Sequence, residues 1–166
     1  MSEQNVATLV SEVNRARRRL YALLRSKDAR ELSKRPASGE WSVVENVRHL
    51  IFAEQAHLGK FLPDGLAWSP MSATRTGKTF TVKGGVVVFR CRERQLVAEY
   101  VCTEPKEDLE KVLRSWELIH QPIRQAVRAK GEAAQYALER HLPHLLRHIE
   151  VIEKLLARAS KDARTV

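Results

Sequence analysis

The chain has 166 residues, which is enough for one domain with a packed core and too few for two ordinary domains. Apolar residues make up 43% of it and charged residues 30%, a composition that excludes a disordered or fibrous protein. No apolar run reaches the roughly 20 residues that a bilayer helix needs, and the first residues lack the basic-then-apolar order of a secretory signal. We therefore expect a cytoplasmic protein with a single domain over residues 1–166.

The positive charge is spread along the chain. A net charge of +9 results from 29 Lys and Arg residues against 20 Asp and Glu residues. The one dense group, from Arg15 to Arg19, fans around a helix axis at about 100° per residue and so forms no stripe. This distribution is typical of solvated helix faces, and it does not indicate a nucleic-acid partner. One non-catalytic alternative stays open, a basic helical binding or stress-response module.

Two amphipathic helices are predicted before residue 63. Residues 6–26 place apolar side chains at the three-and-four spacing of one helix face. After a loop at residues 34–40, Ser42 and Glu45 form a capping box, in which the hydroxyl and the carboxylate each satisfy a backbone N–H group. The second helix then extends to about residue 61 or 62, where Pro63 follows. Its apolar residues lie on most sides, so we expect it to pack against more than one neighbour.

Residues 63–104 lose the helical period. Strand-like runs at 79–83 and 86–89 flank Gly84 and Gly85, which is a hairpin signal, and residues 96–101 can add a third strand. So long a connection in a compact domain is usually a functional or crossover loop. We therefore expect this insertion to span the end of a helix bundle and to carry a small β excursion.

Two further helices are predicted after this insertion. The third begins at residues 103–105, is kinked at Pro122 and ends at Lys130 and Gly131. The fourth runs from about residue 132 to 159, with its apolar residues on one face. Four helices in all predict an all-α fold, a four-helix bundle.

Three histidines lie in the middle of the apolar face of the fourth helix: His141, His144 and His148. An unpaired imidazole in the core costs several tenths to a few kcal/mol, and metal ligation offsets that cost. His144 and His148 are four residues apart, so both rings can reach one ion at about 2.1 Å. Their spacing therefore predicts a metal site.

The third ligand has to come from another helix. His49 in the second helix is the first candidate, because its neighbours there are apolar, and His120 in the third helix is the next. His57, near the end of the second helix, is expected to be exposed.

Two segments of the chain resemble the signature stretches of the DinB-like (YfiT-like) superfamily. The first runs from Trp41 to Leu50, with Glu54 downstream, and the second from His141 to Ile149. The resemblance implies a bundle with up-down-down-up topology, in which a long connection joins the second and third helices. It also implies that His49, His144 and His148 hold the metal, with His141 outside the ligand set.

Three neutral nitrogen ligands leave an ion its full charge and an open position, which is typical of catalytic sites. We expect Zn²⁺ or Ni²⁺ at such a site, where the ion can activate bound water for hydrolysis or bind a thiol as thiolate. Similarity to the family implies a thiol S-transferase that uses a low-molecular-weight thiol. Glu45 and His120 are the predicted acid–base residues. The expected partners are a small-molecule substrate and a second copy of the chain, with no membrane.

Overall fold

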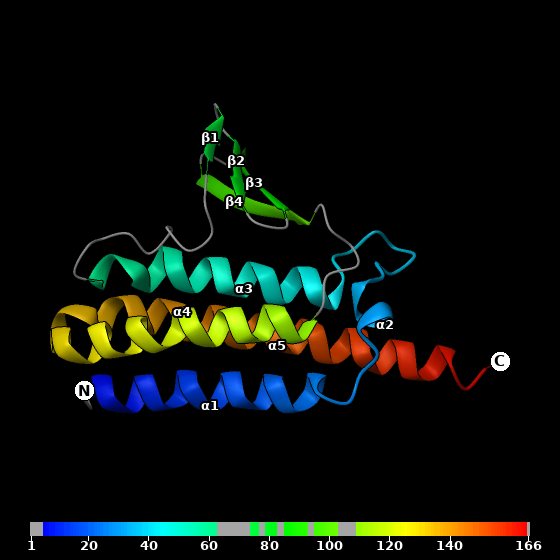
Figure 1. Cartoon of the computed structure of the whole chain (residues 1–166), viewed down its shortest axis with the longest axis horizontal. Coiled ribbons are helices and arrows are strands. Elements are labelled where there is room, and N and C mark those ends of the chain that lie inside the picture. Colours follow the sequence, from blue (N-terminus) through cyan, green and yellow to red (C-terminus); the bar gives the residue numbers. More distant parts are fainter. Residues whose placement is uncertain are drawn as a thin grey trace.

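Four long helices lie side by side along a common axis in the computed structural model of the chain (Figure 1). The structure describes residues 5–62, 74–76, 79–82, 85–92, 95–102 and 109–165. The long helices are α1 (Val6–Leu24), α3 (Val43–Leu58), α4 (Leu109–Lys130) and α5 (Gln135–Asp162). Both α1 and α3 contact α4 and α5, so the four helices enclose one core. The predicted all-α fold is confirmed.

The helix boundaries follow local capping chemistry. The Asn5 side chain accepts a hydrogen bond from the Ala7 N–H group and caps α1. The predicted capping box of α3 is confirmed, because Ser42 Oγ accepts from the Glu45 N–H group and the Glu45 carboxylate accepts from the Ser42 N–H group. The short helix α2 (Ala29–Ser33) lies between them, and the 3₁₀ turn η1 (Gly59–Phe61) continues α3 as far as the sequence predicted.

The junction between α4 and α5 lies at the predicted glycine. α4 ends at Lys130, and Gly131 adopts a φ of 57°, a left-handed conformation that glycine reaches without a Cβ clash. The 3₁₀ turn η3 (Gly131–Ala134) follows, so α5 begins three residues later than residue 132. Pro122 lies inside α4 and Pro143 inside α5, and both helices continue through these prolines.

The core is built from the apolar faces of all four long helices. Large side chains from each of them are almost completely buried, with exposed fractions of 0–1%. Close packing of this kind makes each residue sensitive to truncation, at about 2–5 kcal/mol for a large-to-small change. These side chains are Leu20 of α1, Leu50 of α3, Trp116 and Ile123 of α4, and Leu145 and Ile152 of α5.

A four-stranded antiparallel sheet lies in the connection between α3 and α4. Its strands are β1 (Thr74–Thr76), β2 (Thr79–Val82), β3 (Gly85–Arg92) and β4 (Gln95–Cys102), in the order β1-β2-β3-β4. Val82 pairs with Gly85 at the turn between β2 and β3, and Arg92 pairs with Gln95 at the turn between β3 and β4. The sheet lies beside α3, which β4 contacts (Figure 1). Gly84 and the predicted start of the third helix at 103–105 lie outside the described residues.

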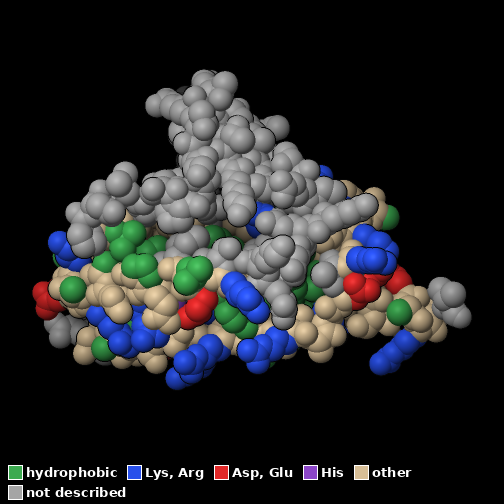
Figure 2. All heavy atoms as spheres, in the orientation of Figure 1, with side chains coloured by type: hydrophobic (Ala, Val, Ile, Leu, Met, Phe, Trp, Pro, Cys, Tyr) green, Lys and Arg blue, Asp and Glu red, His purple; other side chains and the backbone are tan. Residues whose placement is uncertain are grey.

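Lys and Arg side chains form separate groups on the face shown in Figure 2, with tan and green surface between them. This agrees with the spread of charge along the sequence. Among the helices that the structure describes, none is long and apolar enough to cross a bilayer.

Candidate metal centre

Three histidines from two helices converge at the interface of α3 and α5. His49 is on α3, and His144 and His148 are one turn apart on α5. One ring nitrogen of each lies within 4.8 Å of the others. The ring centroids of His144 and His148 lie 5.1 Å and 4.5 Å from that of His49. The structure thus brings together the three residues that the sequence singled out as ligands.

The donor atoms are spaced as ligands of one ion would be. His49 Nε2 lies 3.2 Å from His144 Nε2. Two nitrogens each about 2.1 Å from a tetrahedral ion are about 3.4 Å apart, so the pair needs little adjustment to hold one. His148 Nδ1 lies 3.0 Å from Asn46 Oδ1, so Nε2 is the nitrogen of His148 that remains to act as a ligand atom.

The electrostatics of the cluster favour neutral rings. Burial, together with a smaller contribution from neighbouring charges, lowers the pKa of His49 and of His144 to about 3. The pKa of His148 is lowered by burial and by Arg147. Uncharged imidazoles have free lone pairs at neutral pH, which is the form that binds a metal ion.

Two of these rings also have a buried nitrogen with no hydrogen-bond partner. These atoms are His49 Nδ1 and His144 Nδ1, and the statement covers the part of the chain that the structure describes. Burying three imidazoles with so few partners costs free energy that a core of apolar residues would avoid. A bound cation on the Nε2 atoms offsets this cost, so the residues present fit a divalent metal ion.

Trp41 forms one wall of the cluster. Its ring lies 5.1 Å from that of His49 at an interplanar angle of 53°, and the side chain is half-buried. It also packs against the core beside the start of α3.

Glu45, a predicted acid–base residue, lies at the start of α3 and is engaged there. Its carboxylate accepts from the Ser42 N–H group over 2.8 Å and from Arg35 Nη2 over 2.6 Å. The side chain is buried, and it is not one of the clustered ligands.

His120, the other predicted acid–base residue, belongs to a separate buried network. Its Nδ1 pairs with Glu54, whose other oxygen accepts from Trp116 Nε1 over 2.6 Å. Arg17 is also buried, with its guanidinium 4.9 Å from the Trp116 ring and bonded to Glu117. The spacing of apolar residues along the sequence gave no sign that Glu54 and Arg17 would be buried beside Trp116.

The prediction that His57 is exposed is wrong. The side chain is half-buried, and its Nδ1 lies 3.1 Å from His141 Nδ1. The His57 and His144 rings are 5.5 Å apart, so this pair adjoins the cluster. The reason is that α5 packs along α3 over this turn. The sequence pattern of α3 alone does not show which helix will cover His57.

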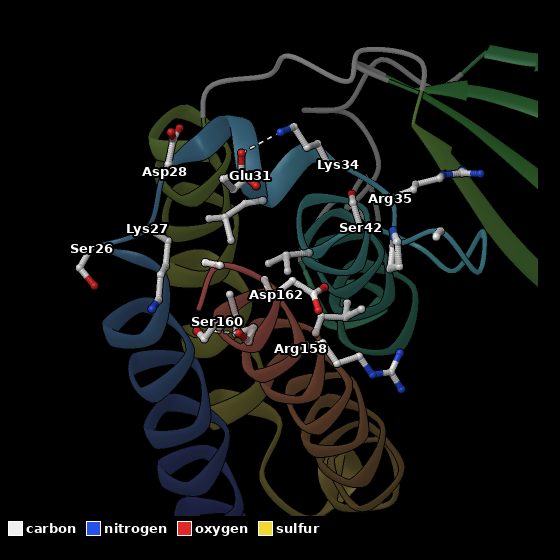
Figure 3. Close-up of a pocket in the computed structure, with 18 residues that line it drawn as sticks. Ser26, Lys27, Asp28, Glu31, Lys34, Arg35, Ser42, Arg158, Ser160 and Asp162 are labelled. Atoms are coloured by element: carbon white, nitrogen blue, oxygen red, sulfur yellow. Dashed lines mark hydrogen bonds and ion pairs between the residues drawn. The ribbon is translucent and has the colours of Figure 1, made fainter. Parts of the chain in front are cut away.

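A separate groove of about 500 Å³ lies at the end of the bundle near the C-terminus of α5 (Figure 3). It is lined by α2, by the loop before α3 and by the last turns of α5, with apolar residues such as Leu32 and Leu155 beside charged ones. None of the three clustered histidines lines it.

The fold and the cluster together define a helix bundle with a three-histidine site between two of its helices. A family model described as the DinB superfamily matches residues 12–152, and the chain belongs to this superfamily. No curated protein matches the chain, and no solved structure does.

Proposed function

We propose that this chain is a divalent-metal-dependent enzyme that acts on a small molecule, by thiol S-transferase-like or hydrolase-like chemistry. The observation that carries the proposal is the convergence of His49, His144 and His148, three uncharged imidazoles, on one point. Membership of the DinB superfamily supports a metal-binding role.

Imidazole ligands suit Zn²⁺ and Ni²⁺, and these are the ions that we propose. When bound by three neutral nitrogens, such an ion supplies Lewis-acid activation of a thiol or of water. The residues of the chain would hold and position this ion. His49 from α3 and the His144–His148 pair from α5 would hold the ion at the helix interface, and the Trp41 ring lies beside His49.

Glu45 and His120 stay predictions as acid–base residues. The contacts of Glu45 with Ser42 and Arg35, and of His120 with Glu54, give each a structural role in the bundle. A direct role in proton transfer would need either side chain to reach a substrate on the metal.

We also propose the up-down-down-up arrangement for the four long helices. The colour gradients along α3 and α4 run in one sense in Figure 1, and those along α1 and α5 in the opposite sense. A cytoplasmic location, a homodimer and a small-molecule partner complete the proposal.

Metal stoichiometry tests the site. Protein stripped with a chelator, reloaded with Ni²⁺ or Zn²⁺ and freed of excess metal should hold about one ion per chain by elemental analysis. His49→Ala, His144→Ala and His148→Ala should each lose it, because two imidazoles bind far more weakly than three. His57→Ala is the matched control, a histidine beside the cluster, and should keep the ion.

Absence of bound metal in the wild-type protein would contradict the proposal, and retention in all three alanine variants would contradict the ligand set. Ni²⁺ should also quench the fluorescence of Trp41, whose ring lies next to His49.

Turnover is tested on the loaded protein with low-molecular-weight thiols and a chromogenic electrophile, and with chromogenic esters. Equal rates for the wild type and His144→Ala in both assays would overturn the enzymatic part.

A further inference from the structure

Asn46 is a buried amide that links α3 to the histidine cluster. It has an exposed fraction of 2% and lies one turn before His49. Its Oδ1 is 3.0 Å from His148 Nδ1, and its Nδ2 is 2.9 Å from the Ser42 carbonyl oxygen. Both polar atoms of the Asn46 side chain therefore have a partner.

The contact with Ser42 settles which way the amide faces. A carbonyl oxygen only accepts hydrogen bonds, so the atom of Asn46 that faces the Ser42 oxygen has to be the donor, Nδ2. Turning the amide over would bring two acceptor oxygens together. Oδ1 is thereby directed at His148, and since this oxygen also only accepts, His148 Nδ1 has to carry the proton.

The position of this proton determines which nitrogen of His148 can bind a metal ion. A neutral imidazole with its proton on Nδ1 has a free lone pair on Nε2. Of the three clustered histidines, His148 is the one whose Nδ1 has a side-chain partner in the described part of the chain, whereas His49 Nδ1 and His144 Nδ1 have none. The Ser42 carbonyl oxygen also accepts the Asn46 backbone N–H, so this anchor belongs to the first turn of α3.

We propose that Asn46 is a positioning residue, which holds His148 in the Nδ1–H tautomer with Nε2 turned to the cluster and so preorganises the metal site. The proposal deepens the proposed metal function and rests on it. A hydrogen bond from the far nitrogen of a metal-bound histidine orients the ring and raises its basicity, and its loss typically weakens metal affinity 10–100-fold.

Three variants and one control test the proposal. Asn46→Leu removes both side-chain hydrogen bonds at similar volume, and Asn46→Ala removes them with less risk of a steric clash. Asn46→Asp keeps an acceptor facing His148 but loses the donor to the Ser42 carbonyl oxygen, so it separates the contact with His148 from the contact with Ser42. Gln55→Met is the control, because it changes another buried amide of α3 that bonds to the Ile51 carbonyl oxygen. Circular dichroism establishes that each variant is folded. If Asn46→Leu does not fold, Asn46→Ala is measured in its place.

The first readout needs no metal. Long-range ¹H–¹⁵N correlation spectra of the metal-free protein should show the Nδ1–H tautomer for His148 in the wild type, in Asn46→Asp and in Gln55→Met. The leucine or alanine variant should shift to the Nε2–H tautomer or to a mixture. An Nε2–H tautomer in the wild type, or no change in the leucine and alanine variants, overturns the proposal.

The second readout is Ni²⁺ affinity by competition with a chelator. It should fall 10–100-fold in Asn46→Leu or Asn46→Ala, recover in Asn46→Asp and stay unchanged in Gln55→Met. Equal affinity in all the variants overturns the positioning role. If the wild type binds no Ni²⁺ and the tautomer still shifts, the metal function fails while the control of the His148 tautomer by Asn46 stands.

Discussion

Glu54 has 0% of its surface exposed, and its two oxygens pair with His120 and with Trp116 Nε1. Burial alone would raise the pKa of this carboxyl group. The hydrogen bond and the charge of His120, with Arg17 nearby, more than offset that effect and hold the pKa below its usual range. Glu54 is thus a buried anion on α3 that is paired with two residues of α4, and the charge of Arg17 on α1 helps to stabilise it.

Glu54→Ala should lower the free energy of unfolding by about 3–5 kcal/mol, because it leaves the buried N–H groups of His120 and Trp116 without their acceptor. Urea denaturation followed by circular dichroism measures the change. Glu150→Ala is the matched control, since the carboxylate of Glu150 pairs with Lys154 on the exposed face of α5 and should leave the midpoint unchanged. Equal midpoints for the two variants would show that the buried network contributes little to stability.

The first turn of α3 links helix formation to the site. Ser42 caps this turn through its side chain, and its carbonyl oxygen holds Asn46, which in turn contacts His148. Arg35 braces the same turn from the preceding loop through Glu45. The element that starts the helix also orients one of the proposed ligands.

Ser42→Ala should destabilise the protein by about 1 kcal/mol, the usual cost of losing an N-cap side chain. The reason is that the Glu45 N–H group, which now donates to Ser42 Oγ, is left buried without a partner. Thermal and urea unfolding measure the loss. Ser38→Ala, which removes an exposed hydroxyl of the preceding loop, is the control and should be silent; an equal loss there would mean that the cap is not what stabilises α3.

At the scale of the whole molecule, the buried histidines make stability depend on pH. In the unfolded chain a histidine titrates near 6.5, whereas burial lowers the pKa of His49 and His144 to about 3 and that of His141 to about 4. Between these values the unfolded state binds more protons than the folded state. The free energy of unfolding therefore falls as the pH drops from about 6.5 towards 3, and is recovered above about 6.5.

The metal-free protein should accordingly unfold at a lower urea concentration at about pH 5 than at about pH 7.5. A double variant, His49→Phe with His144→Leu, should show a smaller difference between the two pH values, because it removes two of the groups that titrate only on unfolding. The same midpoint at both pH values in the wild type would mean that the rings are already protonated in the folded state.

How much was predictable depends on the range of the interaction. The capping box of Ser42 and Glu45, the break at Gly131 and the pairing of His144 with His148 all lie within a few residues along the chain, and the pattern alone predicted them. The choice of His49 over His120 drew on the neighbours of each and on a family resemblance, because it depends on which helix faces which.

By itself, the sequence determined the four long helices, their apolar faces and the one-turn spacing of two histidines, since backbone geometry and local capping set these features. The short helix α2 was not predicted. Only the tertiary structure decided that His120 pairs with Glu54, that His57 meets His141 and that Asn46 reaches His148. These contacts join residues 66–102 positions apart, so they depend on the relative rotation and displacement of packed helices, which no local pattern encodes.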